Sequence, residues 1–200
     1  ADVQDDFKRF RYAVGDAIFD SCKVAGSPNV ISALCDTLQQ KLVTFSAQPE
    51  THWREVEGCV YCLRQSISPN DPAFFSAAKV SELLLLLPTL PDAGCLRSTC
   101  IRTVGTYATW LSRNPHLLPP LLTFVSEGLR REATAAASAQ AMRHLCEGCA
   151  EHLAQEETMR QLLAMYHSTQ SLQLQPADRV DLISALAFVV SMMDMRNMLP

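Results

Sequence analysis

Apolar residues recur every three or four positions along the chain, and prolines cut this pattern into short segments. That spacing places side chains on one face of an α-helix, and a proline usually ends a helix at the residue before it. No Asn-Gly or Asp-Gly turn occurs, and no stretch alternates apolar with polar residues as a half-buried strand does. The sequence therefore predicts an all-α fold with helices over 7–22, 30–45, 53–67, 73–87, 96–111, 116–130, 133–150, 153–169 and 177–193.

After the first helix, the helices fall into pairs, and the second helix of each pair is rich in small residues. These second helices centre near Val60, Val104, Met142 and Leu186, with spacings of about 44, 38 and 44 residues, close to the roughly 40–47 residue period of HEAT and armadillo repeats. The TPR and ankyrin periods, about 34 and 33 residues, are too short. Each HEAT repeat is a helical hairpin that buries its apolar face by stacking on its neighbours.

We therefore predict an α-solenoid of HEAT-like helical hairpin repeats, about four repeats plus one incoming helix, as a single continuous array over residues 1–200. The approximate repeats are 28–68, 72–113, 115–151 and 153–193. A free-standing array needs polar end caps, whereas the segment 188–193 is strongly apolar. We therefore expect the chain to be a fragment of a longer solenoid.

Composition narrows the functional class. The chain has 200 residues, 48% hydrophobic residues and a net charge of −4, so it can bury a core but shows no basic excess for duplex binding. Seven glycines and 7% aromatic residues argue against a Gly-rich nucleotide fold and against a stacking platform for single strands. The longest apolar stretches, 83–87 and 182–193, fall short of the roughly 20 residues that span a bilayer. We expect no direct nucleic-acid binding and no membrane insertion.

Eight cysteines lie among apolar neighbours at helical spacing, which is typical of reduced thiols packed as small hydrophobes. The pairs Cys59–Cys62 and Cys146–Cys149 also invite a zinc or redox interpretation, and His144 and His152 leave a local Cys-Cys-His site as an alternative. Zinc knuckles usually stand some 15–20 residues apart, but these pairs fall in different predicted repeats. A thioredoxin-like dithiol needs a strand before it, and none is predicted. We favour packed thiols, with no metal ion and no cofactor.

No catalytic arrangement is found. The sequence has no Gly-x-Ser-x-Gly elbow, no His-Glu-x-x-His, no Walker motif and no Gly-x-Gly-x-x-Gly. The adjacent pairs Asp5-Asp6 and Glu156-Glu157 do not face one another on a helix, so they make poor acid–base dyads. We predict no enzymatic activity and no catalytic residues, and we assign no partner-binding residues. Arginines that either line a partner-binding face or are simply solvated are Arg9, Arg11, Arg97, Arg102, Arg113, Arg130, Arg131 and Arg143.

Several runs resemble the importin-β superfamily, specifically its transportin-SR and importin-thirteen branch. The first is STCIRTVGTYATWLSRNPHLL (98–118), in which a helix ends in Arg-Asn-Pro before a Leu-x-Pro-Leu-Leu type run, here LPPLL (118–122). The run AAASAQAMRHLCEGC (135–149) looks like that branch's small-residue helix ending in Leu-Cys-x-x-Cys. Two earlier runs, WREVEGCVYC (53–62) and FRYAVGD (10–16), are similar to its Trp-x-x-x-Glu-Ala helix and its Phe/Tyr-Arg-x-x-Val-x-Asp opening. The likeness follows essentially the whole chain in order.

The resemblance implies the middle segment of a karyopherin, a HEAT-repeat receptor that shuttles between nucleus and cytoplasm. Such a receptor binds protein cargo such as Ser/Arg-rich splicing factors, binds the GTPase Ran in its GTP form, and contacts the Phe-Gly repeats of nucleoporins. The chain has no match to the family's Arg-rich cargo helix, so no binding residue is carried over. The alternative is a HEAT-repeat scaffold for a multiprotein complex that does not depend on Ran.

Overall fold

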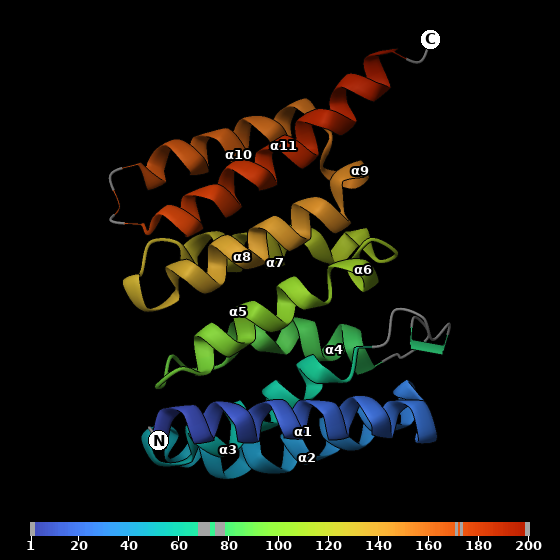
Figure 1. The fold of residues 1–200 in the computed structure, drawn as a ribbon, viewed down its shortest axis with the longest axis vertical. Helices are drawn as coiled ribbons and strands as arrows, with labels where there is room; N and C mark the ends of the chain where they lie inside the picture. Colours follow the sequence, from blue (N-terminus) through green and yellow to red (C-terminus); the bar gives the residue numbers. More distant parts are fainter. Residues whose placement is uncertain (1–2, 68–72, 75–78, 171, 173, 199–200) are drawn as a thin grey trace. The chain divides into compact units, whose positions relative to one another are not determined.

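A computed structural model of the chain describes residues 3–67, 73–74, 79–170, 172 and 174–198 (Figure 1). All regular secondary structure in these residues is α-helix or 3-10 helix, which confirms the predicted all-α class. None of the described helices combines the length and the apolar character needed to cross a bilayer. The chain divides into two compact units, the first formed by Ala1–Leu86 with Pro91–Leu96, the second by Leu87–Leu90 with Arg97–Pro200.

In the first unit, α1 (Val3–Ala25), α2 (Ser27–Ala47) and α3 (Pro49–Gln65) pack against one another, and α4 (Lys79–Leu86) contacts α2 (Figure 1). Proline lies in the first turn of both α2 and α3, where its missing N–H costs no helical hydrogen bond. Gly26, between α1 and α2, has a φ of 82°, a left-handed conformation that a residue with a Cβ rarely adopts. The apolar stripes predicted from the sequence form the core, with Ile31, Leu38, Phe45, Val56, Val60 and Leu63 buried.

The second unit contains η2 (Leu87–Thr89), α5 (Leu96–Thr106), α6 (Ala108–Leu111), η3 (Pro115–Leu117), α7 (Leu118–Gly128), α8 (Glu132–Gly148), α9 (Ala150–Leu153), α10 (Glu156–Thr169) and α11 (Pro176–Met198). Helix α8 lies at its centre and packs against α6, α7 and α11. The buried residues of this unit include Leu121, Val125, Met142, Leu145 and Val189. Each long helix corresponds to a predicted helical segment, with ends shifted by a few residues.

Two predicted helices are interrupted. The segment 96–111 breaks at Tyr107, where ψ is 11°, and the segment 133–150 breaks at Cys149, where ψ is 16°. The two breaks belong to one contact, because a Cβ on Gly148 would lie 3.0 Å from the Ala108 Cβ, and the Cys149 thiol donates to the Ala108 carbonyl at 3.4 Å. The short helices α6 and α9 follow these breaks.

Two other segments also differ from the prediction. The segment 153–169 begins at Glu156, because Leu153 closes α9 and Gln155 is extended. In the segment 73–87, residues 73–74 form a 3-10 turn and α4 begins at Lys79, while residues 75–78 lie outside the described residues.

Small residues bring α5 and α8 close together. A Cβ on Gly105 would lie 2.6 Å from the Ala141 Cα and 2.9 Å from its Cβ, so only a glycine fits at this point of α5. Together with the Ala108–Gly148 contact, this pair forms a seam along α8, which we call the small-residue seam and define by Gly105, Ala108, Ala141 and Gly148.

Guanidinium groups link α8 to the helices on both sides. The Arg102 Nη1 of α5 donates to the Gln140 Oε1 at 2.7 Å, and the Arg143 Nε lies 2.9 Å from the Asp181 Oδ1 of α11. The separation along the chain is the same from Arg102 to Arg143 as from Gln140 to Asp181. The same kind of polar bridge therefore recurs between successive helices of the array.

Candidate protein-binding groove

A groove of about 620 Å³ runs between α7 and α10, and residues of α8 and α9 also line it. A second hollow of about 320 Å³ continues it towards the C-terminal ends of both helices and shares Ser126, Gln161 and Met165 with the first. The larger part is lined by Pro115, Leu118, Pro119, Leu122, Thr123, Ser126, Met142, Glu151, His152, Leu153, Gln155, Thr158, Gln161, Leu162 and Met165. A groove of this size suits a short peptide segment or a small molecule.

One wall is the outer face of α7. Proline is tolerated at the start of this helix, and Leu121 and Val125 turn inward to the core. Pro119, Leu122 and Ser126 are spaced by three and four residues, so they share one face, which lies beside the core-facing one. This wall is therefore mainly apolar, with the hydroxyls of Thr123 and Ser126 as its polar groups.

The other wall is α10. Met159 and Leu162 are buried, while Thr158, Gln161 and Met165 follow one another along the face towards the groove. This wall offers hydrogen-bonding side chains as well as a thioether. Apolar surface with a few polar groups is the usual lining of a ligand site.

Helix α9 closes one end of the groove. It brings Glu151 and His152 to the rim, and the His152 Nε2 lies 2.7 Å from the Ser112 carbonyl oxygen. His152 is therefore anchored to the backbone between α6 and η3. Among the described residues, no three His, Cys, Asp or Glu side chains gather in a way that could hold a metal ion.

The two Cys-x-x-Cys pairs differ in their surroundings. Cys146 and Cys149 are buried, and burial raises the pKa of each thiol from 9.0 to about 12. Cys59 and Cys62 are half-buried, and burial raises the pKa of both thiols. The positive charge of Lys41 acts against this rise at Cys59, and that of Arg11 acts against it at Cys62. The pair in α8 therefore consists of packed thiols that hold their protons at neutral pH.

We expect Cys146 and Cys149 to resist alkylation in the folded chain. A rise of pKa from 9.0 to about 12 leaves about a thousandfold less thiolate than in the unfolded chain at neutral pH. The same shift means that both thiols favour the folded state below about pH 9, and that this contribution is lost as the pH rises towards 12. Iodoacetamide labelling at pH 8 with and without urea, followed by peptide mass spectrometry, measures the alkylation rate of each thiol in the folded and the unfolded chain. Equal labelling rates in the two conditions would contradict the burial.

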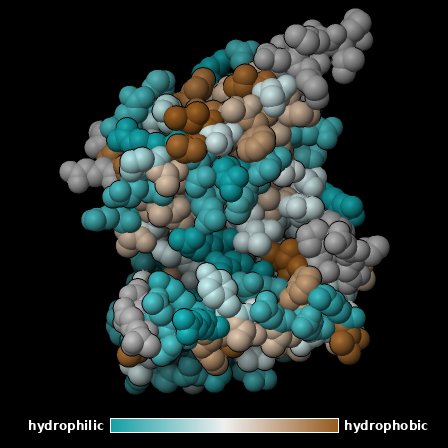
Figure 2. Space-filling model, in the orientation of Figure 1, coloured by the Kyte–Doolittle hydropathy of each residue, from teal (hydrophilic) through white to brown (hydrophobic). Residues whose placement is uncertain are grey.

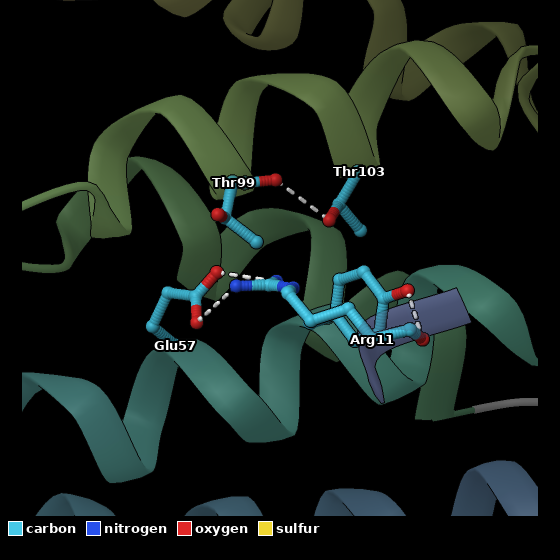
Figure 3. A network of polar contacts seen from close by, with 5 residues as sticks. Arg11, Glu57, Thr99 and Thr103 are labelled. Atoms are coloured by element: carbon cyan, nitrogen blue, oxygen red, sulfur yellow. Dashed lines mark hydrogen bonds and ion pairs between the residues drawn. The ribbon is translucent and has the colours of Figure 1, made fainter. Parts of the chain in front are cut away.

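The arginines proposed as possible partner contacts are largely engaged within the chain. Arg11 of α1 donates to both carboxylate oxygens of Glu57, at 3.1 and 2.7 Å (Figure 3). Its guanidinium carbon lies 3.9 Å from the Tyr61 ring centroid, and the Tyr61 hydroxyl donates to the Arg11 carbonyl at 2.7 Å. Burial alone would lower the pKa of Arg11, but the hydrogen bonds and charge of Glu57 outweigh it and raise that pKa. We call Arg11, Glu57 and Tyr61 the α1–α3 clamp.

Other arginines are engaged in the same way. The Arg97 Nη2 lies 3.6 Å from the Glu127 Oε2, and Arg102 and Arg143 form the bridges on α8. Figure 3 also shows the Thr103 hydroxyl donating to the Thr99 carbonyl within α5, a local bond that satisfies a buried hydroxyl. Arg9 and Arg130 are exposed, and Arg130 lies on the hollow that continues the groove.

Hydrophilic residues cover most of the face seen in Figure 2, and hydrophobic residues form smaller groups. One such group lies over α10 and α11, whose exposed apolar side chains include Leu163, Val180 and Ile183. Sequence reasoning left the partner-binding residues unassigned and missed the groove. The signal that could have found one wall is the stripe Pro119, Leu122 and Ser126, beside the core-facing residues of the same helix.

Comparisons with known proteins agree with this architecture. Residues 77–165 match the family model described as the Transportin-3/Importin-13 third TPR domain. The chain is 28% identical over 195 residues to Transportin MOS14 of Arabidopsis thaliana, covering 93% of this chain and 20% of that protein. It is 26% identical over 198 residues to the uncharacterized protein C11G11.07 of Schizosaccharomyces pombe (98% and 20%). It is 23% identical over 159 residues to the mRNA transport regulator MTR10 of Saccharomyces cerevisiae (75% and 15%).

A solved structure titled "Importin13 cytosolic state" has the same fold, with a TM-score of 0.82 at 21% identity, over 94% of this chain and 21% of that chain. The fold is therefore the predicted α-solenoid of HEAT-like helical hairpins. The chain is therefore similar to a segment of importin-β-like transport receptors, and the matching family model covers its residues 77–165. It spans about a fifth of the length of the first two of these relatives. The exact repeat boundaries stay a prediction.

Proposed function

We propose that the chain is part of a nuclear transport receptor that carries protein cargo, such as Ser/Arg-rich splicing factors, into the nucleus under the control of Ran-GTP. The observation that carries the proposal is the family match over 77–165, together with relatives named as a transportin and an mRNA transport regulator. Such a receptor works by binding and release, acts without enzymatic chemistry of its own, and shuttles between nucleus and cytoplasm.

The test is a pull-down of the full-length protein with Ran loaded with GTP or with GDP. Capture by Ran-GTP but not by Ran-GDP, with loss of bound cargo, is the expected result. Equal or absent capture would contradict the transport proposal and would favour the alternative, a HEAT-repeat scaffold without Ran dependence.

We infer further that the groove between α7 and α10 binds the Phe-Gly repeats of nucleoporins. Pro119 and Leu122 offer an apolar surface for a phenylalanine ring, and the buried Leu118 and Leu162 also line the groove. Met165 adds a thioether, a group that packs well against aromatic rings. The side chains of Gln161 and Thr158 can form hydrogen bonds with the backbone of a bound peptide. That backbone is accessible next to the phenylalanine, because the glycine that follows has no side chain. The groove is thus matched to an uncharged aromatic peptide.

An aspartate in place of Leu122 is expected to weaken Phe-Gly peptide binding by about tenfold or more, or about 1.4 kcal/mol, because it places a charge on the apolar wall. Leu122 is only half-buried, so the helix should still form. Fluorescence anisotropy with a labelled Phe-Gly peptide measures the affinity.

The matched control is Leu163→Asp. Leu163 lies on α10 next to the groove-lining Leu162, is exposed, and does not line the groove. Its substitution should leave the affinity unchanged. Equal loss in both variants, or in neither, would contradict binding in this groove.

A further inference from the structure

The pair Cys59–Cys62 is the sequence motif that the proposed function does not use. Both residues lie on α3, three positions apart, so their side chains leave the same side of the helix. The neighbouring residues Val56, Val60 and Leu63 are buried, whereas both thiols are half-buried and free. The α3 pair is therefore a dithiol that a small reagent can reach.

The spacing decides what can join the two sulfur atoms. Side chains three residues apart on a helix have Cβ atoms about 5–6 Å apart, whereas a disulfide needs about 3.5–4.5 Å. A direct S–S bond would therefore require the helix to distort. A single atom placed between the two sulfurs lengthens the bridge and fits the regular helix.

The number of ligands narrows the class of bridging atom. Structural zinc takes four protein ligands, and no group of three His, Cys, Asp or Glu side chains in the described part of the chain could hold a metal ion. The two thiols of the α3 pair therefore suit an atom that forms three bonds, two of them to thiolate sulfurs and the third to a substituent that it already carries. Trivalent arsenic carrying one carbon substituent has this valence.

We propose that Cys59 and Cys62 form a chelating site for trivalent monoorganic arsenicals. In the reaction, R–As(OH)₂ condenses with the two thiols: both S–H bonds and both As–O bonds break, two As–S bonds form, and two water molecules leave. Arsenic stays trivalent, so no oxidant or reductant is needed. The product is a ring closed through one helical turn of α3.

The second Cys-x-x-Cys pair of the chain is a built-in comparison. Cys146 and Cys149 have the same spacing but are buried, with exposed fractions of 0% and 1%. The helix also breaks between them, and the Cys149 thiol already donates to the Ala108 carbonyl. The α8 pair should therefore stay unmodified under conditions that saturate the α3 pair.

The experiment treats the full chain carrying Cys95→Ser, which removes the exposed single thiol, with phenylarsine oxide. Excess glutathione then strips singly bound arsenic, and intact mass spectrometry counts the adducts that remain. One glutathione-resistant adduct is expected, released by the dithiol dimercaptopropanol. Cys59→Ser and Cys62→Ser should each abolish it, and the double variant Cys146→Ser, Cys149→Ser should retain it.

Three outcomes would overturn the proposal, and the first two concern the α3 pair. One is an adduct that persists in Cys59→Ser or Cys62→Ser, and the other is a Cys95→Ser chain that binds no glutathione-resistant arsenic. Circular dichroism of every variant checks that helix content is kept, above all for the double variant, because Cys146 and Cys149 are buried whereas Cys59 and Cys62 are only half-buried. An adduct lost only on substitution of Cys146 and Cys149 would also contradict it.

Discussion

Replacement of Gly105 by valine should destabilise the chain by about 3 kcal/mol, at the upper end of the usual cost of overpacking. The reason is that the added side chain meets backbone: even the first Cβ would lie 2.6 Å from the Ala141 Cα. A flexible side chain could swing away, but α8 can yield only by moving as a whole. Urea denaturation followed by circular dichroism measures the change in the free energy of unfolding.

The control is Gly58→Ala, in the middle of α3. Apart from its chain neighbours and the backbone of its own helix, no heavy atom lies within 4 Å of a Cβ built at Gly58, so the alanine enters open space. Because glycine is unfavourable in a helix interior, this change should stabilise the chain by about 0.5–1 kcal/mol. If Gly105→Val unfolds at the same urea concentration as the parent chain, the close approach of α5 and α8 is wrong.

The second large effect concerns the α1–α3 clamp. Arg11→Met, which keeps an apolar chain against the Tyr61 ring, should cost about 3 kcal/mol because it leaves the buried carboxylate of Glu57 without its main partner. Glu57→Leu should cost a similar amount, since its guanidinium partner is three-quarters covered.

The double variant Arg11→Met, Glu57→Leu should recover most of that loss, because two apolar side chains of similar volume then pack together. Urea denaturation of the four proteins gives the interaction energy directly. An exposed ion pair supplies the comparison: Asp20→Asn, which removes the partner of Lys23, should cost less than about 1 kcal/mol. Additive losses at Arg11 and Glu57 would show that the clamp is not a coupled pair.

Helix positions could be predicted because they depend on local patterns. The starts of α2 and α7, each with proline in its first turn, lie within three residues of the predicted starts at 30 and 116. Apolar residues at three- and four-residue spacing identified the core faces. The breaks at Tyr107 and Cys149 could not be predicted, because they arise where α6 meets the end of α8, a contact between distant parts of the sequence.

The candidate sites show the same limit. The sequence placed both Cys-x-x-Cys pairs on helices, but their different burial depends on which helix covers each face. The groove was missed because it depends on the distance between α7 and α10, which no local sequence pattern gives, although the stripe on α7 marks one of its walls. The arginine set was left open for the same reason, since only the fold shows that Arg11 and Arg143 have acidic partners.

The small-residue seam has two contact points on α8, and the number of residues between them cannot change without breaking one of the contacts. Ala141 and Gly148 are about two helical turns apart, so Ala141 faces Gly105 of α5 and Gly148 faces Ala108 of α6 from the same side of α8. A single-residue insertion between them would rotate one contact away by about 100° and place a larger side chain against Ala108. Length changes in this array should therefore be tolerated in its connecting loops, whereas α8 should accept substitutions but no insertion or deletion.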